Sequence, residues 1–182
     1  MIIWINGAFG AGKSTLATGL REALPGSVVA DPEDVGSILR SSMRGHPHAV
    51  WDYQEYPAWR RLTVRLVTEL HHLAGGTVIV PMTVLHQPYA RDVLEPLAAL
   101  GVPVHHLVLH TDPSPLRARI DASLEYPHDE ARSEAVRAHR RRRINDYEQA
   151  FKAWLNTARV IDTGKLTPGQ ALEAALAQLA RT

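Results

Sequence analysis

The strongest constraint on this chain is a short glycine-containing stretch near its start. Gly7 is followed by four residues and then by Gly12, Lys13 and Ser14, which is the spacing of a phosphate-binding loop. The glycines lack a Cβ, so the backbone can turn tightly and approach a polyphosphate. The loop amides and the positive end of the following helix then favour an anion. We therefore expect this loop to bind the phosphates of a nucleotide.

The sequence on either side of the loop fits this interpretation. Residues 2–5 are apolar and predict a buried strand, and leucines at 16, 20 and 24 share one face of a helix. Lys13 is expected to reach the β- and γ-phosphates, and the Ser14 hydroxyl to bind Mg²⁺. The alternative is an ordinary glycine turn that binds nothing. The predicted nucleotide-binding residues of the loop are Gly7, Ala8, Phe9, Gly10, Ala11, Gly12, Lys13, Ser14 and Thr15.

Strands and helices are predicted to alternate along the rest of the chain. Buried strands are expected at 27–30, 77–80, 104–109 and 159–161, in addition to 2–5. Helical patterns separate them, which is typical of an α/β protein with a parallel sheet. We predict one domain over 1–182, with a five-stranded parallel sheet, helices on both faces and the layout of a P-loop nucleoside monophosphate kinase.

Composition excludes several classes of protein. The chain has 182 residues, no cysteine and a formal net charge of +1, so thiolate metal sites are excluded and no strong field attracts nucleic acid. No stretch is apolar enough to span a bilayer. The first expected strand begins at residue 2, which leaves no room for a signal peptide. We expect a cytoplasmic enzyme that binds neither nucleic acid nor membrane, and the sequence leaves its oligomeric state open.

Asp31 has two possible roles. It follows an apolar strand and precedes Pro32, so it can cap a helix that starts at the proline. It also stands at the carboxyl end of a strand, which is where ligands bind in open α/β sheets. In the second role it would act on the substrate, as the base that accepts the hydroxyl proton or as a group that orients that hydroxyl, and could bind Mg²⁺ through water.

Two further segments are candidates for covering a substrate. Residues 40–60 are polar and aromatic, and could either pack in the core or line a pocket. Residues 120–143 combine a polar loop with an arginine-rich helix, which predicts either a solvated face or a lid that clamps transferring phosphates.

Several stretches resemble the tunicamycin-resistance protein family. The resemblance lies in residues 1–13, in Asp31-Pro32-Glu33 with Gly36 and Leu39-Arg40, and in Gln54 with Tyr56-Pro57 and Trp59-Arg60. It continues in Val80-Pro81-Met82-Thr83 with His86 and in Val104-His105-His106, so that it covers about residues 1–120. Chloramphenicol phosphotransferase, shikimate kinase and nucleoside monophosphate kinases share the layout more distantly.

The resemblance implies an ATP-dependent phosphotransferase that acts, with Mg²⁺, on a small hydroxyl-bearing substrate such as a tunicamycin-like nucleoside antibiotic. Two alternatives stay open: a protein that binds ATP and sequesters the drug without chemistry, and a metabolic nucleoside or small-molecule kinase. The catalytic candidates are Asp31 and Lys13, the metal candidates are Ser14 and Asp31, and Arg119 is expected to pack on adenine. The substrate-binding candidates are Asp31, Arg40, Gln54, Trp59, Arg60, Met82, Thr83 and His86.

Overall fold

Five parallel strands form a single sheet in the order β2-β3-β1-β4-β5. The computed structural model describes residues 1–180. The strands are β1 (Ile2–Gly7), β2 (Val28–Val29), β3 (Val78–Pro81), β4 (Val104–His110) and β5 (Arg159–Asp162). Every residue of β1 is buried, since it is the central strand. Such continuous apolar runs are typical of a parallel sheet covered on both faces.

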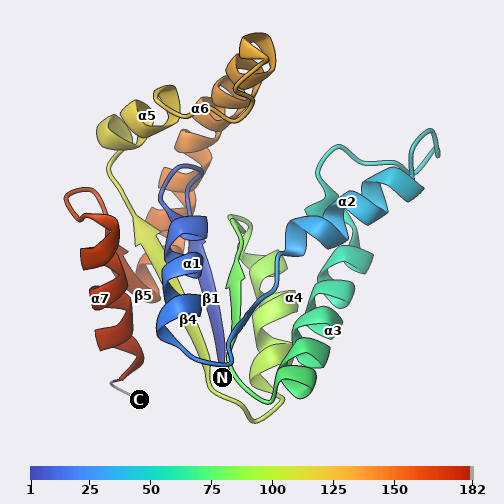
Figure 1. Ribbon diagram of the computed structural model, residues 1–182. Helices are drawn as coiled ribbons and strands as arrows, with labels where there is room; N and C mark the ends of the chain where they lie inside the picture. The colour runs from blue at the N-terminus through green and yellow to red at the C-terminus, as the bar shows by residue number, and fades with distance from the viewer. Residues whose placement is uncertain (181–182) are drawn as a thin grey trace.

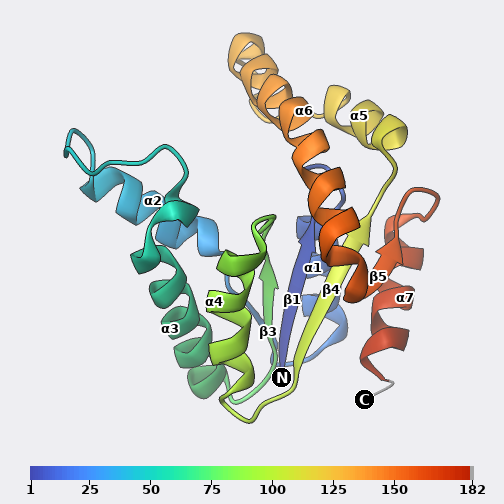
Figure 2. The ribbon, with the colours of Figure 1, turned by 180° about the vertical axis from the view of Figure 1, so that it is seen from behind.

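Helices connect the strands and cover both faces of the sheet. They are α1 (Lys13–Ala23), α2 (Pro32–Ser42), α3 (Pro57–Ala74), α4 (Gln87–Ala98), α5 (Pro113–Asp121), α6 (Glu130–Ala153) and α7 (Pro168–Leu179), with short 3₁₀ turns η1 (Tyr53–Glu55) and η2 (Leu155–Thr157). Helices α1 and α7 lie on one face, and α3, α4 and the second half of α6 lie on the other (Figures 1 and 2). None of the helices within residues 1–180 is long and apolar enough to cross a membrane.

The two faces bury alternate residues of the central strand. Ile3 and Ile5 pack in the cluster that contains the apolar faces of α1 and α7, whereas Ile2 and Trp4 pack with α3 and α4. This alternation follows from the two-residue period of a strand. The sheet is therefore fixed in register, which holds the loop after β1 in a defined position between the neighbouring strands.

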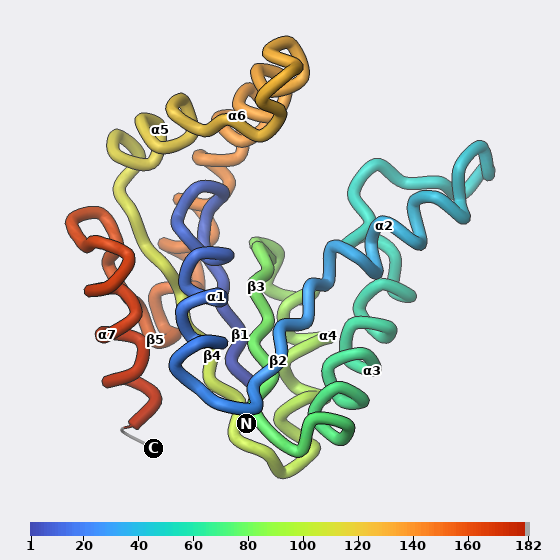
Figure 3. The backbone as a smooth tube through the Cα atoms, in the orientation of Figure 1, coloured from blue at the N-terminus to red at the C-terminus, as the bar shows by residue number. Residues whose placement is uncertain are grey.

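Two helical arms extend beyond the carboxyl ends of the strands. The first consists of α2, which follows the short edge strand β2 (Figure 3). The second consists of α5 and the first half of α6, which lie on the other side of the phosphate-binding loop (Figure 1). The N-terminus and the end of α7 lie at the opposite end of the sheet. Ligands in open α/β sheets bind at the carboxyl ends, so the arms flank the expected site.

The predicted fold class is confirmed, including the parallel sheet and helices on both faces. The second strand is shorter than expected and spans only Val28–Val29. Helix α3 leaves Leu62 and Leu73 exposed and buries Thr63 and Val67 instead.

Candidate active site

The loop between β1 and α1 has the backbone that its glycines predict. Gly7, Gly10 and Gly12 all have positive φ, and Gly12 occupies the N-cap of α1 in the left-handed conformation. A Cβ on Gly7 would lie 2.6 Å from the carbonyl oxygen of Leu109, so β4 also excludes a side chain there. No side chain caps α1. The amides of its first turn are therefore available to an anion, as at other phosphate-binding helix ends.

Lys13 is folded back over this loop. Its Nζ donates to the carbonyl oxygens of Ala8 at 2.8 Å and Gly7 at 3.2 Å, and it lies 5.5 Å from the centre of the Phe9 ring. Burial lowers the pKa of Lys13 to about 8, and the nearby Glu33 carboxylate partly offsets this effect. A bound polyphosphate would place negative charge beside the amine of Lys13. This charge would raise the affinity of the amine for a proton.

Asn6 and Thr83 hold the start of the loop. The buried Asn6 amide donates to the carbonyl of Val84 at 2.8 Å and accepts from the backbone N–H groups of Gly7 and Val84. The Thr83 hydroxyl donates to the carbonyl of Gly7 at 2.8 Å. The segment after β3 is thereby tied to the phosphate-binding loop. Sequence analysis did not single out Asn6, although a polar residue at the end of an apolar strand was a usable signal.

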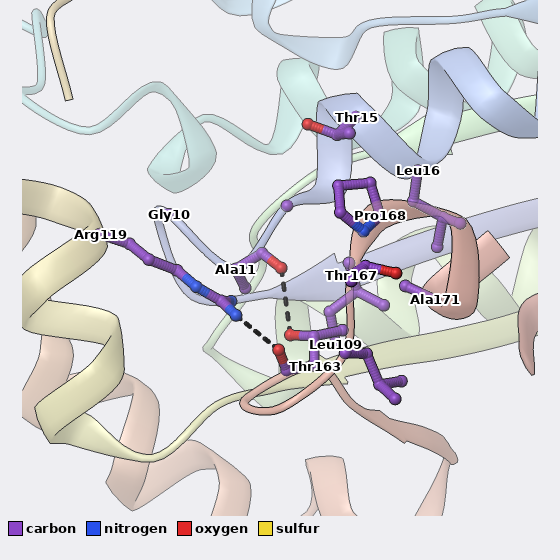
Figure 4. A pocket seen from close by; sticks show the side chains of 12 residues that line it. Gly10, Ala11, Thr15, Leu16, Leu109, Arg119, Thr163, Thr167, Pro168 and Ala171 are labelled. Carbon is purple, nitrogen blue, oxygen red and sulfur yellow. Dashed lines mark hydrogen bonds between the residues drawn. The ribbon is translucent and has the colours of Figure 1, made fainter. Parts of the chain in front are cut away.

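A cavity of about 270 Å³ opens on one side of the loop (Figure 4). One wall is the loop itself with the start of α1, and the opposite wall is the segment between β5 and α7. Its lining is mostly apolar, which suits the flat base and sugar of a nucleotide. The lining residues are Gly10, Ala11, Gly12, Thr15, Leu16, Leu109, Arg119, Thr163, Leu166, Thr167, Pro168 and Ala171.

Thr163 joins the three segments that form this cavity. Its hydroxyl lies 2.7 Å from the Thr111 hydroxyl and 3.2 Å from the carbonyl oxygen of Ala11. The Arg119 guanidinium donates to the Thr163 carbonyl (Figure 4) and, at 3.3 Å, to the Thr111 hydroxyl. Arg119 therefore lines this cavity, held by backbone and hydroxyl groups. Sequence analysis missed Thr163 because the residue approaches the loop only through tertiary structure.

A second cavity, of about 440 Å³, opens on the other side of the loop. Here α2 and η1 form one wall, and Phe9 with α6 forms the other. The lining is rich in charged, polar and aromatic side chains, which suits an acceptor that carries hydroxyl groups. The lining residues are Phe9, Glu33, Ser37, Arg40, Trp51, Asp52, Tyr53, Gln54, Glu55, Met82, Thr83, His139 and Arg143.

Of the three acidic residues at the start of α2, Asp31 and Glu33 face different surroundings. Asp31 accepts a hydrogen bond from the Glu33 backbone N–H at 2.9 Å and caps the helix, and it does not line the second cavity. Glu33 does line it. Partial burial raises the pKa of the Glu33 carboxyl, the charge of Asp31 raises it further, and Lys13 acts in the opposite direction. Glu33 is thus a carboxyl that lines the second cavity and interacts electrostatically with Lys13.

A family model described as an AAA domain matches residues 2–158. The chain belongs to this AAA domain family. No curated protein sequence matches the chain at a significant level. The shared P-loop implies that this member of the AAA domain family binds a nucleotide.

Solved structures extend the comparison. The tunicamycin resistance protein of Deinococcus radiodurans has 29% sequence identity with a TM-score of 0.73, and the match covers 100% of this chain and 96% of that one. This finding confirms the resemblance predicted from the sequence. A sugar kinase from Janibacter sp. HTCC2649 has 20% identity and a TM-score of 0.65, covering 98% and 94% of the two chains. A gluconokinase from Sinorhizobium meliloti 1021 has 19% identity and a TM-score of 0.63, covering 98% and 91%. These last two share the fold of this AAA domain.

Four of the predicted substrate residues line the second cavity of this AAA domain. They are Arg40, Gln54, Met82 and Thr83. The Gln54 amide donates to the Thr83 carbonyl at 2.8 Å, which ties η1 to the segment after β3. Arg40 lies over the Tyr53 ring at 5.0 Å. These contacts hold the cavity wall in place and leave charged groups facing the open space.

Besides Asp31, three predicted substrate residues lie outside the lining of this cavity. Trp59 is 0% exposed and donates from its indole nitrogen to the Pro32 carbonyl, so it belongs to the core. Arg60 is buried against Asp92, Tyr89 and the Gln54 carbonyl, and acts as a brace behind η1. His86 precedes α4 and packs on the Tyr89 ring at 4.2 Å. A residue count along the sequence cannot distinguish these positions from the cavity wall.

The arginines of α6 lie in two different surroundings. Arg137 and Arg141 pair with acidic residues of α5 and α6, including Glu134, and stabilise the arm itself. Arg143 lines the second cavity and pairs with Asp146 at 2.9 Å. His139, one turn earlier, lines the same cavity and contacts Phe9 edge to face. Burial and neighbouring arginines lower the pKa of His139, which favours its neutral form.

The residues predicted for Mg²⁺ fit an ion that is held mainly by phosphate and water. The exposed Ser14 hydroxyl stands in the first turn of α1 and forms no hydrogen bond among the described residues. Asp31 is also exposed. Within residues 1–180, no three His, Asp or Glu side chains are arranged around a metal position. Mg²⁺ at phosphoryl-transfer sites commonly keeps waters and uses few protein ligands, so this donor set is compatible with it.

Proposed function

We propose that this protein is a phosphotransferase that transfers the γ-phosphoryl group of ATP to a hydroxyl group of a small molecule. The observation that carries the proposal is that the phosphate-binding loop lines both cavities, and that Glu33, whose charge acts on Lys13, lines the second. The first cavity is mostly apolar and suits the nucleoside part of ATP, so we call it the nucleotide cavity. The second cavity is polar and suits an acceptor, so we call it the acceptor cavity. A protein that only binds ATP has no use for the second cavity with a carboxyl group at the phosphate end.

The residues support the following sequence of events. The amides of the loop and Lys13 hold the β- and γ-phosphates, and Mg²⁺ at Ser14 would neutralise developing charge. The Glu33 carboxylate accepts the proton of the acceptor hydroxyl. The hydroxyl oxygen forms a bond to the γ-phosphorus while the bond from this phosphorus to the β,γ-bridging oxygen breaks, and ADP leaves. A carboxyl with a raised pKa is suited to this exchange, because it binds the proton more readily than an ordinary glutamate.

We further propose that the acceptor is a nucleoside antibiotic of the tunicamycin type. The support is the 29% identity over the whole chain with a tunicamycin resistance protein. The product would be an inactive phosphorylated drug. A protein that instead sequestered the drug would use the same cavity without transferring a phosphoryl group, and a metabolic nucleoside kinase would accept simpler nucleosides.

The proposal is tested by incubating the protein with Mg-ATP and each of a panel of acceptors: tunicamycin, uridine, other nucleosides and gluconate. Mass spectrometry then measures whether any acceptor gains a phosphoryl group. Lys13→Ala is the matched control, because it removes the cation that binds the phosphates. A phosphorylated product with wild type and almost none with Lys13→Ala is the expected result. A stable complex whose acceptor mass stays unchanged over many equivalents of ATP would favour sequestration.

A further inference from the structure

Trp51 is a large aromatic side chain that is left open at the mouth of the acceptor cavity. It is 88% exposed, more than any other large apolar side chain in residues 1–180, and it lines the cavity. The other tryptophans are buried or partly buried: Trp4 and Trp59 lie in the core, and Trp154 packs beneath α6. An exposed indole at a pocket mouth gains contact area only when something covers it.

The backbone around Trp51 is fixed although its ring is free. On one side, the backbone N–H of Val50 donates to the Tyr56 hydroxyl at 2.9 Å. On the other side, the Asp52 carboxylate accepts from the backbone N–H of Gln54 at 2.9 Å and caps η1. Two side chain to backbone hydrogen bonds therefore hold the residues that flank the indole. A ligand that stacks on it would meet a platform whose position is already set.

The wall that carries Trp51 is docked closely on α2. A Cβ on Gly36 would lie 2.6 Å from the Tyr53 ring, so only glycine allows this approach. Arg40 covers the same ring. Because η1 is held against α2 in this way, Trp51 stays on the same cavity as Glu33.

We propose that Trp51 stacks on a planar ring of the acceptor, and that this contact selects acceptors with a nucleobase-like ring over open-chain sugar acids. The inference rests on the proposed function and specifies its substrate class. The neighbouring carboxyls Asp52 and Glu55 line the same end of the cavity. Their carboxylates accept hydrogen bonds from the N–H and O–H groups of a neutral ring. Stacking of bases on aromatic side chains is a common, strong contact in nucleotide recognition.

Calorimetry measures the affinity for each acceptor in every variant, because Trp51→Ala and Trp51→Phe lack the exposed indole. In the proteins that keep Trp51, quenching of tryptophan fluorescence by acrylamide, which reaches the exposed Trp51 and poorly reaches the buried indoles, shows whether an acceptor covers the ring. The probes are uridine and tunicamycin, with gluconate as the acceptor that has no planar ring. Trp51→Ala, Trp51→Phe and Leu73→Ala are compared with wild type. Leu73 is a matched control because it is 82% exposed and lies on α3 outside the acceptor cavity.

We expect uridine or tunicamycin to protect the quenchable fraction in wild type and in Leu73→Ala. Trp51→Ala should weaken binding of that probe about 5- to 100-fold, and Trp51→Phe by less, because a smaller ring remains. Equal affinity in Trp51→Ala, or no protection by either ring-bearing probe, overturns the inference. Protection without any phosphorylated product would leave Trp51 as the platform and remove the phosphotransferase. Phosphorylation with unchanged affinity in Trp51→Ala would do the reverse.

Discussion

The two cavities beside the phosphate-binding loop are built in different ways. The nucleotide cavity is lined by backbone and apolar groups, and its segments are joined by the hydrogen bonds of Thr163, Thr111 and Arg119. The acceptor cavity lies between two arms, and no hydrogen bond among the described residues joins α6 to α2 or η1. The ring contact between Phe9 and His139 is on the α6 side of this cavity. The first cavity is therefore preorganised, whereas the second can be completed when an acceptor brings its walls together.

The largest expected effect concerns the carboxyls of Asp31 and Glu33 at the start of α2. Glu33→Gln keeps the shape of the side chain and removes the base, so kcat should fall by about two to four orders of magnitude. Asp31→Asn keeps the capping oxygen and should lower kcat much less. Steady-state kinetics with Mg-ATP and the best acceptor of the panel measures both, with Asp34→Asn as an exposed acidic control on the same turn. The opposite ranking, with Asp31→Asn nearly inactive and Glu33→Gln active, would return the base to Asp31.

Closure of the acceptor cavity should appear in hydrogen exchange. The part of α6 that carries His139 and Arg143 is expected to exchange about tenfold more slowly when both Mg-ATP and acceptor are present, because these side chains then contact a ligand. Peptides that cover β4 and β5 should change little, since they are already protected by the sheet. The measurement is exchange followed by mass spectrometry. Unchanged exchange over 120–143 would leave the arginine-rich arm as a solvated face.

A smaller effect is expected on the nucleotide side. Thr163→Val removes the hydroxyl beside Ala11 and Thr111 while keeping the shape of the side chain, so the loop is held less firmly. The loss of the hydrogen bonds of this hydroxyl should raise KM for ATP about 3- to 10-fold with little change in kcat. Thr157→Val is the control, because its hydroxyl bonds to Trp154 in η2. If the variant lowered kcat and kept KM, Thr163 would affect chemistry and not nucleotide positioning.

The smallest signal is a proton linked to nucleotide binding. Burial lowers the pKa of Lys13 to about 8, so at pH 9 most of the free protein has a neutral amine. Phosphates favour the charged form, and binding should then take up about one proton at pH 9 and little at pH 7. Calorimetry in buffers of different ionisation enthalpy measures this uptake. Lys13→Arg should show none, because guanidinium stays charged, and wild type without uptake at pH 9 would contradict the lowered pKa.

The same pKa has a consequence for the free protein. The folded state binds this proton less tightly than the unfolded chain, whose lysine has a pKa of about 10.5. The unfolded state therefore carries more protons between about pH 8 and pH 10.5, and the contribution of Lys13 to stability rises with pH across that window.

The parts of the site that sequence predicted are those set by local spacing. The conformation of loop 7–15 depends on consecutive residues, so its sequence predicts it. The alternation of apolar segments was enough to predict the sheet. Glu33, Ser37 and Arg40 also share a helical face. The catalytic carboxyl was nevertheless predicted to be Asp31, because Asp31 follows a strand. Capping by Asp31 and the cavity position of Glu33 follow from the same helix start.

The parts that sequence could not predict depend on which elements meet in three dimensions. Trp51 and Trp59 lie in one aromatic stretch, yet one is exposed at the cavity and the other is fully buried. The difference arises because η1 turns the chain before α3 begins. Thr163 reaches the loop only because β5 lies beside β4 and α7 packs next to α1. Neither arrangement has a local pattern.

The most direct measurement is a structure of the protein with a non-hydrolysable ATP analogue, Mg²⁺ and an acceptor. We expect the nucleoside part of the analogue to bind in the cavity lined by Arg119 and Thr163. We expect the acceptor to bind in the cavity lined by Glu33 and Trp51. One acceptor hydroxyl should lie about 3–3.5 Å from the γ-phosphorus, as a reacting atom requires, and within hydrogen-bond distance of Glu33. An acceptor bound with no hydroxyl near the γ-phosphate, or bound outside this cavity, would contradict the proposed transfer.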